Sequence, residues 1–176
     1  YVGRGYKQYG RKDAAIASKL DILPYPAWHL LPMSAYWNSA VRVGGGDIMR
    51  NRFAVMMSTR GCPHTCYFCT SPLLSGYKAY RRRTNENVID EIRWLKETFG
   101  VEEIQFLDDN FFVSAPRVKQ LCRLLIEYFP DMVFSVPAGT EINALDDEMI
   151  ELLGAANFHK ITLAVEAGDQ DVQDAV

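Results

Sequence analysis

The fold of this chain is decided by one short stretch, which we call the cysteine loop: Arg60-Gly61-Cys62-Pro63-His64-Thr65-Cys66-Tyr67-Phe68-Cys69. Three of the four cysteines lie here within eight residues, in the spacing C-x3-C-x2-C. Three thiolates from one loop suit a soft metal centre, and a [4Fe–4S] cluster held by protein alone would take a fourth. Cys122 stands far along the chain, on the apolar side of a predicted helix. One iron would therefore lack a protein ligand, and an open metal position is where a small molecule can bind and react.

Other interpretations of the cysteines stay open at this point. His64 could complete a Cys3His zinc site, although structural zinc sites usually show two separated ligand pairs rather than one crowded run. A cluster at this loop could also serve only structure or electron transfer. A disulfide framework is typical of small secreted domains, and nothing in the composition suggests one. The spacing favours an open iron–sulfur cluster on Cys62, Cys66 and Cys69.

The cysteine loop resembles the signature of the radical S-adenosylmethionine (radical SAM) superfamily, in which an aromatic residue precedes the last cysteine, as Phe68 does here. The resemblance implies that Cys62, Cys66 and Cys69 hold a [4Fe–4S] cluster whose fourth iron is chelated by SAM, with Phe68 at the cofactor site. It also implies that the reduced cluster cleaves SAM to a 5′-deoxyadenosyl radical. An electron-donor protein such as flavodoxin or ferredoxin is then an expected partner.

The composition narrows the class of protein. The chain has 176 residues, of which 48% are hydrophobic and 23% charged, and its formal net charge is −3. These values are typical of a globular protein and do not favour nucleic acid as a partner. The one basic run, residues 78–83, is interpreted as a solvated approach to the next helix. No apolar run approaches the roughly 20 residues of a membrane span, and no signal peptide is apparent, so no membrane is expected. The free cysteines fit the reducing cytoplasm, which is the predicted location.

Residues 1–50 show little periodicity, and two prolines within Leu20–Trp28 favour an extended or turning path. The aromatic residues nearby predict that this segment packs along a domain surface, and Gly44–Gly46 predicts a turn. The segment Leu20–Met33 resembles the connector that joins an N-terminal cobalamin-binding domain to the barrel in the B12-dependent branch of the radical SAM superfamily. The resemblance implies that residues 1–50 are a connector from such a domain, which would lie upstream of Tyr1.

From Phe53 onward, short β runs alternate with helical segments, which is the pattern of parallel βα units. The predicted strands are Phe53–Met57, Ile104–Leu107, Met132–Val136 and Ile161–Val165. The predicted helices begin after Thr84 or Asn85, and after Ser114, Asp146 and Asp169. The fold class is therefore α/β, and residues 51–176 are expected to form the N-terminal part of a radical SAM parallel βα barrel of the partial TIM-like type, which stops after about four βα units. A complete barrel takes about 250 residues, so this part alone is expected to be inactive.

Each predicted strand ends in a chemically distinctive group. In order along the chain, these groups are the cysteine loop, Asp108-Asp109-Asn110, Thr140-Glu141 and Glu166. In a parallel βα barrel the carboxyl ends of the strands meet at one edge, where the active site lies. Carboxylates at that edge would accept hydrogen bonds from the ammonium and ribose hydroxyls of SAM. For any one acid taken alone, a helix cap or a solvated turn explains the residue equally well.

The resemblance to the B12-type branch assigns roles to some of these residues. It implies that Asp108 or Asp109 contacts the amino group of SAM, with Asn110 in the same cofactor site. The segment around Glu166 resembles a strand-four pattern whose glutamate lies near SAM. Glu141 stands where many relatives carry an arginine, so no role is carried over to it.

Together these resemblances imply a cobalamin-dependent radical SAM methyltransferase that acts on an unactivated carbon of a small-molecule, natural-product-like substrate. Two alternatives remain. One is a radical SAM enzyme without cobalamin, such as a methylthiotransferase or a ring-forming enzyme. The other is a non-catalytic zinc or iron–sulfur module, which metal analysis and SAM binding would separate from the enzymes.

Overall fold

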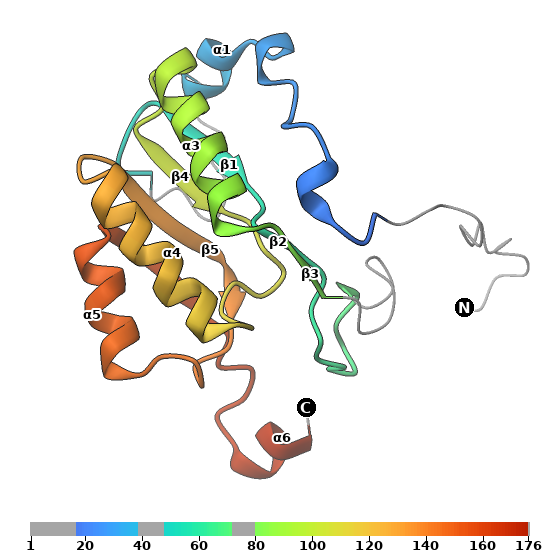
Figure 1. The fold of residues 1–176 in the computed structure, drawn as a ribbon. Coiled ribbons are helices and arrows are strands. Elements are labelled where there is room, and N and C mark those ends of the chain that lie inside the picture. Colours follow the sequence, from blue (N-terminus) through green and yellow to red (C-terminus); the bar gives the residue numbers. More distant parts are fainter. Residues whose placement is uncertain (1–16, 39–47, 72–79, 176) are drawn as a thin grey trace, which may run out of the picture.

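A four-stranded parallel sheet forms the centre of the structure, a computed structural model that describes residues 17–38, 48–71 and 80–175 (Figure 1). The strands, in their order across the sheet, are β1 (Phe53–Met56), β4 (Glu103–Phe106), β5 (Val133–Thr140) and β6 (Phe158–Leu163). Every neighbouring pair is parallel. The prediction of an α/β fold built from parallel βα units is therefore confirmed.

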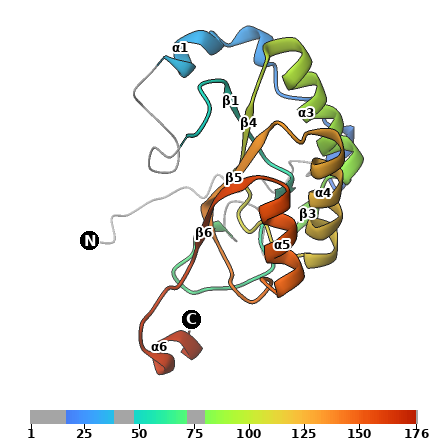
Figure 2. The same cartoon turned by 90° about the vertical axis from the view of Figure 1, so that its left-hand side faces the viewer.

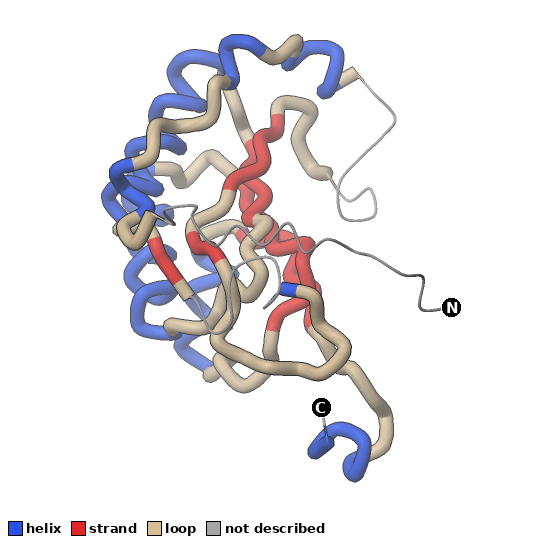
Figure 3. Tube along the Cα trace, turned by 90° about the vertical axis from the view of Figure 1, so that its right-hand side faces the viewer, coloured by secondary structure: helices blue, strands red, loops and turns tan. Residues whose placement is uncertain are grey.

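Three helices connect the strands and lie on one face of the sheet, as Figures 2 and 3 show. They are α3 (Asn85–Phe99), α4 (Ala115–Tyr128) and α5 (Asp147–Ala155), and a short α6 (Gln170–Ala175) follows β6. Each connecting helix returns the chain to the start of the next strand, so all four strands point the same way. None of the helices in the described ranges is long and apolar enough to cross a membrane.

Capping hydrogen bonds explain where two of these helices begin. The Thr84 hydroxyl accepts from Asn87 N at 3.2 Å before α3, and the Asp146 carboxylate accepts from Met149 N at 2.8 Å before α5. Both helix starts confirm the sequence prediction. Ser114 also precedes α4 as predicted, but its side chain makes no capping hydrogen bond.

The core between the sheet and the helices is built around phenylalanine rings. Phe106 of β4 lies 4.9 Å from Phe111 and 6.2 Å from Phe158 of β6, measured between ring centroids. Cys122 of α4 is fully buried in the same core, and burial raises the pKa of its thiol to about 12. Cys122 is therefore an inert core residue, as the helical pattern predicts.

β5 and β6 differ most from their predicted bounds. β5 continues through Pro137 to Thr140, and its register with β6 shifts between Val136 and Thr140. Pro137 has no N–H to donate, so a regular hydrogen-bond ladder cannot run through it. β6 begins at Phe158, earlier than predicted, and ends before Glu166, which therefore lies beyond the strand.

The described part of the predicted connector packs against the βα units, as its aromatic residues predict. It contains the short turns Leu20–Ile22 and Trp28–Leu30 and the helix α1 (Met33–Trp37). The indole Nε1 of Trp37 donates to Phe53 O at 2.8 Å, and the Tyr25 ring lies 6.0 Å from the Trp94 ring. The predicted turn at Gly44–Gly46 lies outside the described residues.

Candidate functional site

The carboxyl ends of the four parallel strands lie at one edge of the sheet, and we call the groups that follow them the rim. The rim consists of the cysteine loop, Asp108–Asn110, Thr140–Glu141 and Glu166. Parallel pairing of β1 with β4 and of β4 with β5 places the first three groups on adjacent strands. The predicted site residues therefore occupy one edge of the sheet.

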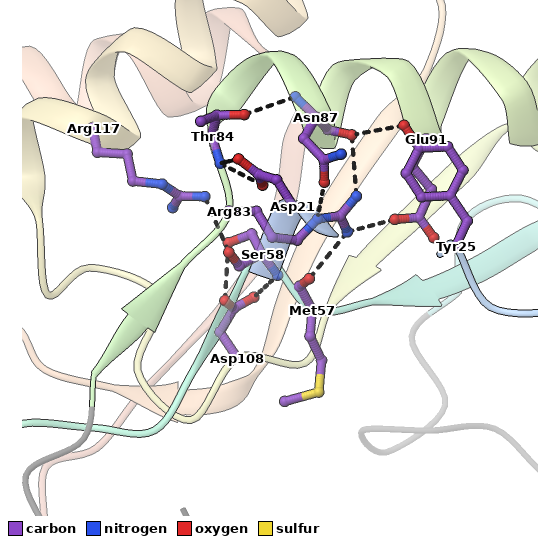
Figure 4. A network of polar contacts seen from close by, with 10 residues as sticks. All are labelled: Asp21, Tyr25, Met57, Ser58, Arg83, Thr84, Asn87, Glu91, Asp108 and Arg117. Atoms are coloured by element: carbon purple, nitrogen blue, oxygen red, sulfur yellow. Dashed lines mark hydrogen bonds and ion pairs between the residues drawn. The ribbon is translucent and has the colours of Figure 1, made fainter. Parts of the chain in front are cut away.

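Asp108 fixes the chain just before the cysteine loop. It is 1% exposed, and its carboxylate accepts hydrogen bonds from Ser58 N at 3.2 Å, from Ser58 Oγ at 2.9 Å and from Thr59 Oγ1. The two segments meet because β1 and β4 are paired, with Leu107 N donating to Met56 O at 2.8 Å. Figure 4 shows the Asp108 carboxylate directed at Ser58. Three donors of the protein itself already occupy this carboxylate.

A buried arginine holds the same turn from another direction. Arg117 is 7% exposed, and its Nη2 donates to Ser58 O at 3.3 Å. Burial raises the pKa of Asp108, while hydrogen bonds from Thr59 and Ser58 and the nearby Arg117 lower it. Burial lowers the pKa of Arg117, while Tyr80 and Asp108 raise it. Ser58 is thus fixed by opposite charges, which orders the approach to the cysteine loop.

Asp109, the next residue, has a different environment. It is exposed, and its Oδ2 accepts from Gly61 N at 2.8 Å, directly before Cys62. The resemblance left Asp108 and Asp109 as alternatives for the same contact. The structure separates them, because Asp108 is enclosed by protein donors and Asp109 lies at the surface of the rim.

Asn110 joins the rim groups of three strands. It is buried, and its Oδ1 accepts from Phe112 N at 3.2 Å and from Thr140 Oγ1 at 2.9 Å at the end of β5. Burial raises the pKa of the Cys62 thiol, while hydrogen bonds from the His64 backbone and the Asn110 side chain lower it. The Asn110 side chain therefore links the end of β4 to the end of β5 and influences the pKa of the first cysteine of the loop.

The cysteine loop carries three free thiols. Cys62 and Cys66 are half-buried, Cys69 is exposed, and Cys69 N donates to Cys66 O at 3.1 Å. Phe68 is 50% exposed beside them. In the described ranges, no three His, Cys, Asp or Glu side chains are grouped closely enough to hold one metal ion. The three thiols therefore share a loop without being arranged around a common point.

The donor set nevertheless fits an iron–sulfur cluster. Three free thiols, none of them fully buried, follow one another on a single loop. Cysteine thiolates are the usual ligands of such clusters. The fourth thiol of the chain, Cys122, is fully buried in α4 and is not available to this loop. The chain therefore offers three thiolates, and not four, at the rim.

His64 of the cysteine loop forms a contact that the sequence analysis missed. Its Nε2 lies 3.0 Å from Glu141 Oε2, at the end of β5. The imidazole is therefore directed at the carboxylate that follows β5. No sequence signal pairs these two residues, because the contact depends on how β5 is placed beside β4.

Glu166 lies beyond β6 with an exposed side chain and a backbone φ of 56°. A positive φ is uncommon for a residue other than glycine and concentrates at functional sites. The structure thus places Glu166 three residues beyond the carboxyl end of β6, in an unusual backbone conformation.

Arg83 corrects the interpretation of the basic run 78–83. Its backbone N donates to Ser58 O at 3.0 Å, and its guanidinium donates to Met57 O at 3.3 Å, to Asn87 Oδ1 at 2.6 Å and to Asn87 O at 3.0 Å. It also forms an ion pair with Glu91, whose side chain is 1% exposed (Figure 4). The prediction of a solvated run is therefore wrong for Arg83.

The residues before Arg83 form a short β-strand that the sequence pattern does not predict. β3 (Arg81–Arg82) pairs antiparallel with β2 (Thr59–Arg60), and each of these strands is only two residues long. The short ladder joins the start of the cysteine loop to the segment that leads into α3. Periodicity cannot reveal a strand this short.

Comparison with known proteins places these features in a family. A family model described as the radical SAM superfamily matches residues 56–176. Cytidylyl-2-hydroxyethylphosphonate methyltransferase of Streptomyces wedmorensis is 31% identical over 163 residues, which cover 90% of this chain and 29% of the relative. An uncharacterized methyltransferase of Pyrococcus horikoshii, PH0819, is 26% identical over 179 residues, which cover 99% of this chain and 36% of the relative.

A solved structure shares the fold. The radical S-adenosylmethionine methyltransferase TsrM from Kitasatospora setae, with cobalamin and a [4Fe–4S] cluster bound, matches with a TM-score of 0.61 at 20% identity. The match covers 68% of this chain and 23% of TsrM. The chain spans about a third of the length of the curated relatives quoted above.

Proposed function

The chain belongs to the radical SAM superfamily, and we propose that it is part of a cobalamin-dependent radical SAM methyltransferase that acts on a small molecule. The observation that carries this proposal is the cysteine loop at the carboxyl end of β1, with the fourth cysteine enclosed in the core. The two relatives described above are named methyltransferases, and TsrM was solved with cobalamin. The names of the relatives support methyl transfer as the reaction, and the TsrM structure supports cobalamin as a cofactor.

Cys62, Cys66 and Cys69 would hold a [4Fe–4S] cluster, which when reduced and bound to SAM supplies the electron that cleaves SAM to a 5′-deoxyadenosyl radical. The chain itself contributes the position of these thiols. Asp108 and Arg117 fix Ser58 before the loop, and Asp109 fixes Gly61. The approach to Cys62 is therefore held before any cofactor binds.

We assign the SAM contact to Asp109 rather than to Asp108. Asp108 is 1% exposed and receives three hydrogen bonds from the protein, whereas Asp109 is exposed and Gly61 N binds only its Oδ2. Its Oδ1 would accept from the ammonium or ribose of SAM. The exposed side chains of Phe68 and Glu166 are proposed as further cofactor contacts, and Asn110 as a residue that orients Cys62.

The domain arrangement is also part of the proposal. We propose that residues 1–50 connect a cobalamin-binding domain to the barrel portion formed by residues 51–176. The packing of Trp37 on Phe53 and of Tyr25 on Trp94 supports a fixed path for this connector. An electron-donor protein, such as a flavodoxin or ferredoxin, and a cytoplasmic location complete the proposal.

The experiment that tests this function is anaerobic iron–sulfur reconstitution of the intact protein. Cys66→Ala should abolish both the visible absorbance of the cluster and SAM cleavage, because it removes one of three thiolates. Cys122→Ala is the matched control, since it makes the same chemical change in the core, and it should retain iron and SAM cleavage. The proposal is rejected if Cys66→Ala keeps both the cluster absorbance and SAM cleavage. It is also rejected if the wild-type protein binds zinc and does not bind SAM.

A further inference from the structure

The cysteine loop is bonded to the ends of two strands, at one point on each side of Cys62. Before Cys62, Gly61 N donates to Asp109 Oδ2 at 2.8 Å, just after β4. After Cys62, His64 Nε2 lies 3.0 Å from Glu141 Oε2, just after β5. The two contacts come from neighbouring strands, because β4 and β5 are paired. Cys62 therefore lies between two points at which the loop is held.

Beyond His64, the hydrogen bonds of the loop are local. Cys69 N donates to Cys66 O at 3.1 Å, and Ser71 N lies 3.4 Å from Cys69 Sγ. In the part of the chain that the structure describes, no hydrogen bond or ion pair joins these residues to a strand of the sheet. The contact of His64 is therefore the one that positions this half of the loop relative to the sheet.

Glu141 extends from a fixed strand end. Thr140, directly before it, is 2% exposed, and its hydroxyl donates to Asn110 Oδ1 at 2.9 Å. The carbonyl of Thr140 also accepts from Ala164 N at 2.9 Å. The Glu141 side chain is 28% exposed and the His64 side chain 49%, so water shields their contact only in part. A well-held carboxylate thus meets a histidine of a loop that has few other attachments.

We propose that His64 and Glu141 form a latch, a hydrogen bond from Nε2–H to the carboxylate, that positions the cysteine loop for the assembly and retention of its cluster. The latch restricts the chain between the first and second thiols, Cys62 and Cys66. It therefore reduces the conformational entropy that is lost when three thiolates converge on one cluster. The inference rests on the proposed function, and it gives Glu141 a positioning role that the sequence could not assign.

Millisecond hydrogen–deuterium exchange of the intact protein without cofactor tests the latch itself. His64→Ala and Glu141→Ala should each raise the exchange rate of the amides of residues 62–69 about fivefold, because a partly exposed pair contributes modestly. Glu141→Gln keeps an acceptor oxygen and should retain most of the protection. His29→Ala, a change at an exposed histidine of the connector, is the matched control and should have no effect.

The release of iron to a chelator tests the consequence for the cluster. From the reconstituted protein, bathophenanthroline should remove iron about fivefold faster in His64→Ala and in Glu141→Ala than in the wild type. Glu141→Gln should stay within about twofold of the wild type. The double variant His64→Ala/Glu141→Ala should release iron no faster than either single variant, because all three lack the same contact.

Three results would reject the latch. One is unchanged exchange in both alanine variants. Another is a double variant whose effect is the product of the two single effects, because the residues then act independently. The third is equal iron release from Glu141→Gln and Glu141→Ala, because the retained hydrogen bond then has no effect. A wild-type protein that assembles no cluster would instead refute the proposed function, and the exchange rates would still decide whether the latch exists.

Discussion

Asp108→Asn is expected to destabilise the intact protein by about 3 kcal/mol, because a buried carboxylate that accepts three hydrogen bonds is replaced by an amide. An asparagine has one acceptor oxygen, so it cannot accept from Ser58 N, Ser58 Oγ and Thr59 Oγ1 together. The change also leaves Arg117 without its buried counter-charge. Urea unfolding followed by circular dichroism measures the loss.

The matched control for this prediction is Asp131→Asn. Asp131 is exposed and pairs with Lys96 at 2.6 Å, so its replacement should change the free energy of unfolding by less than about 1 kcal/mol. Asp108→Asn should also impair cluster assembly, since it loosens the approach to Cys62. Had Asp108 been a direct SAM contact, the variant would keep its unfolding midpoint and lose only SAM affinity, and that outcome would contradict the structural role.

Arg83→Met is the second substitution with a large expected effect, a loss of about 3–5 kcal/mol in the free energy of unfolding. The substitution removes hydrogen bonds to Met57 O and Asn87 and leaves the Glu91 carboxylate buried without its partner. Removing one member of a buried ion pair costs far more than removing an exposed pair. Chemical denaturation of the intact protein gives the value.

Arg93→Met provides the control on the same helix. Arg93 pairs with Asp90 at the surface, at 2.6 Å, so its loss should cost no more than about 1 kcal/mol. The double variant Arg83→Met/Glu91→Leu should recover part of the stability, because no unpaired charge then remains in the core. Equal effects of Arg83→Met and Arg93→Met would show that Arg83 is solvated and would contradict its structural role.

Much of the fold could be predicted from the sequence because its determinants are local. Thr84 and Asp146 cap the helices that follow them through bonds to residues three positions along the chain. The alternation of strands and helices fixes a parallel sheet, since parallel strands require crossover connections. The rim then follows, because the ends of parallel strands lie at one edge.

The parts that could not be predicted depend on contacts between distant segments. Asp108 and Asp109 are adjacent and identical in type, and only the pairing of β1 with β4 encloses one and exposes the other. The contact between His64 and Glu141 requires β5 beside β4. In the sequence Arg83 is one more basic residue of a charged run, and only the structure shows its ion pair with Glu91.

The central claim is that three thiolates hold a cluster whose fourth iron is left for SAM. Electron–nuclear double resonance of the reduced, reconstituted protein tests it with SAM labelled by ¹⁵N at the amino group. The account predicts a ¹⁵N hyperfine coupling to the cluster, because the amino group binds the fourth iron directly. A reduced [4Fe–4S] cluster that shows no such coupling in the presence of saturating SAM would contradict it.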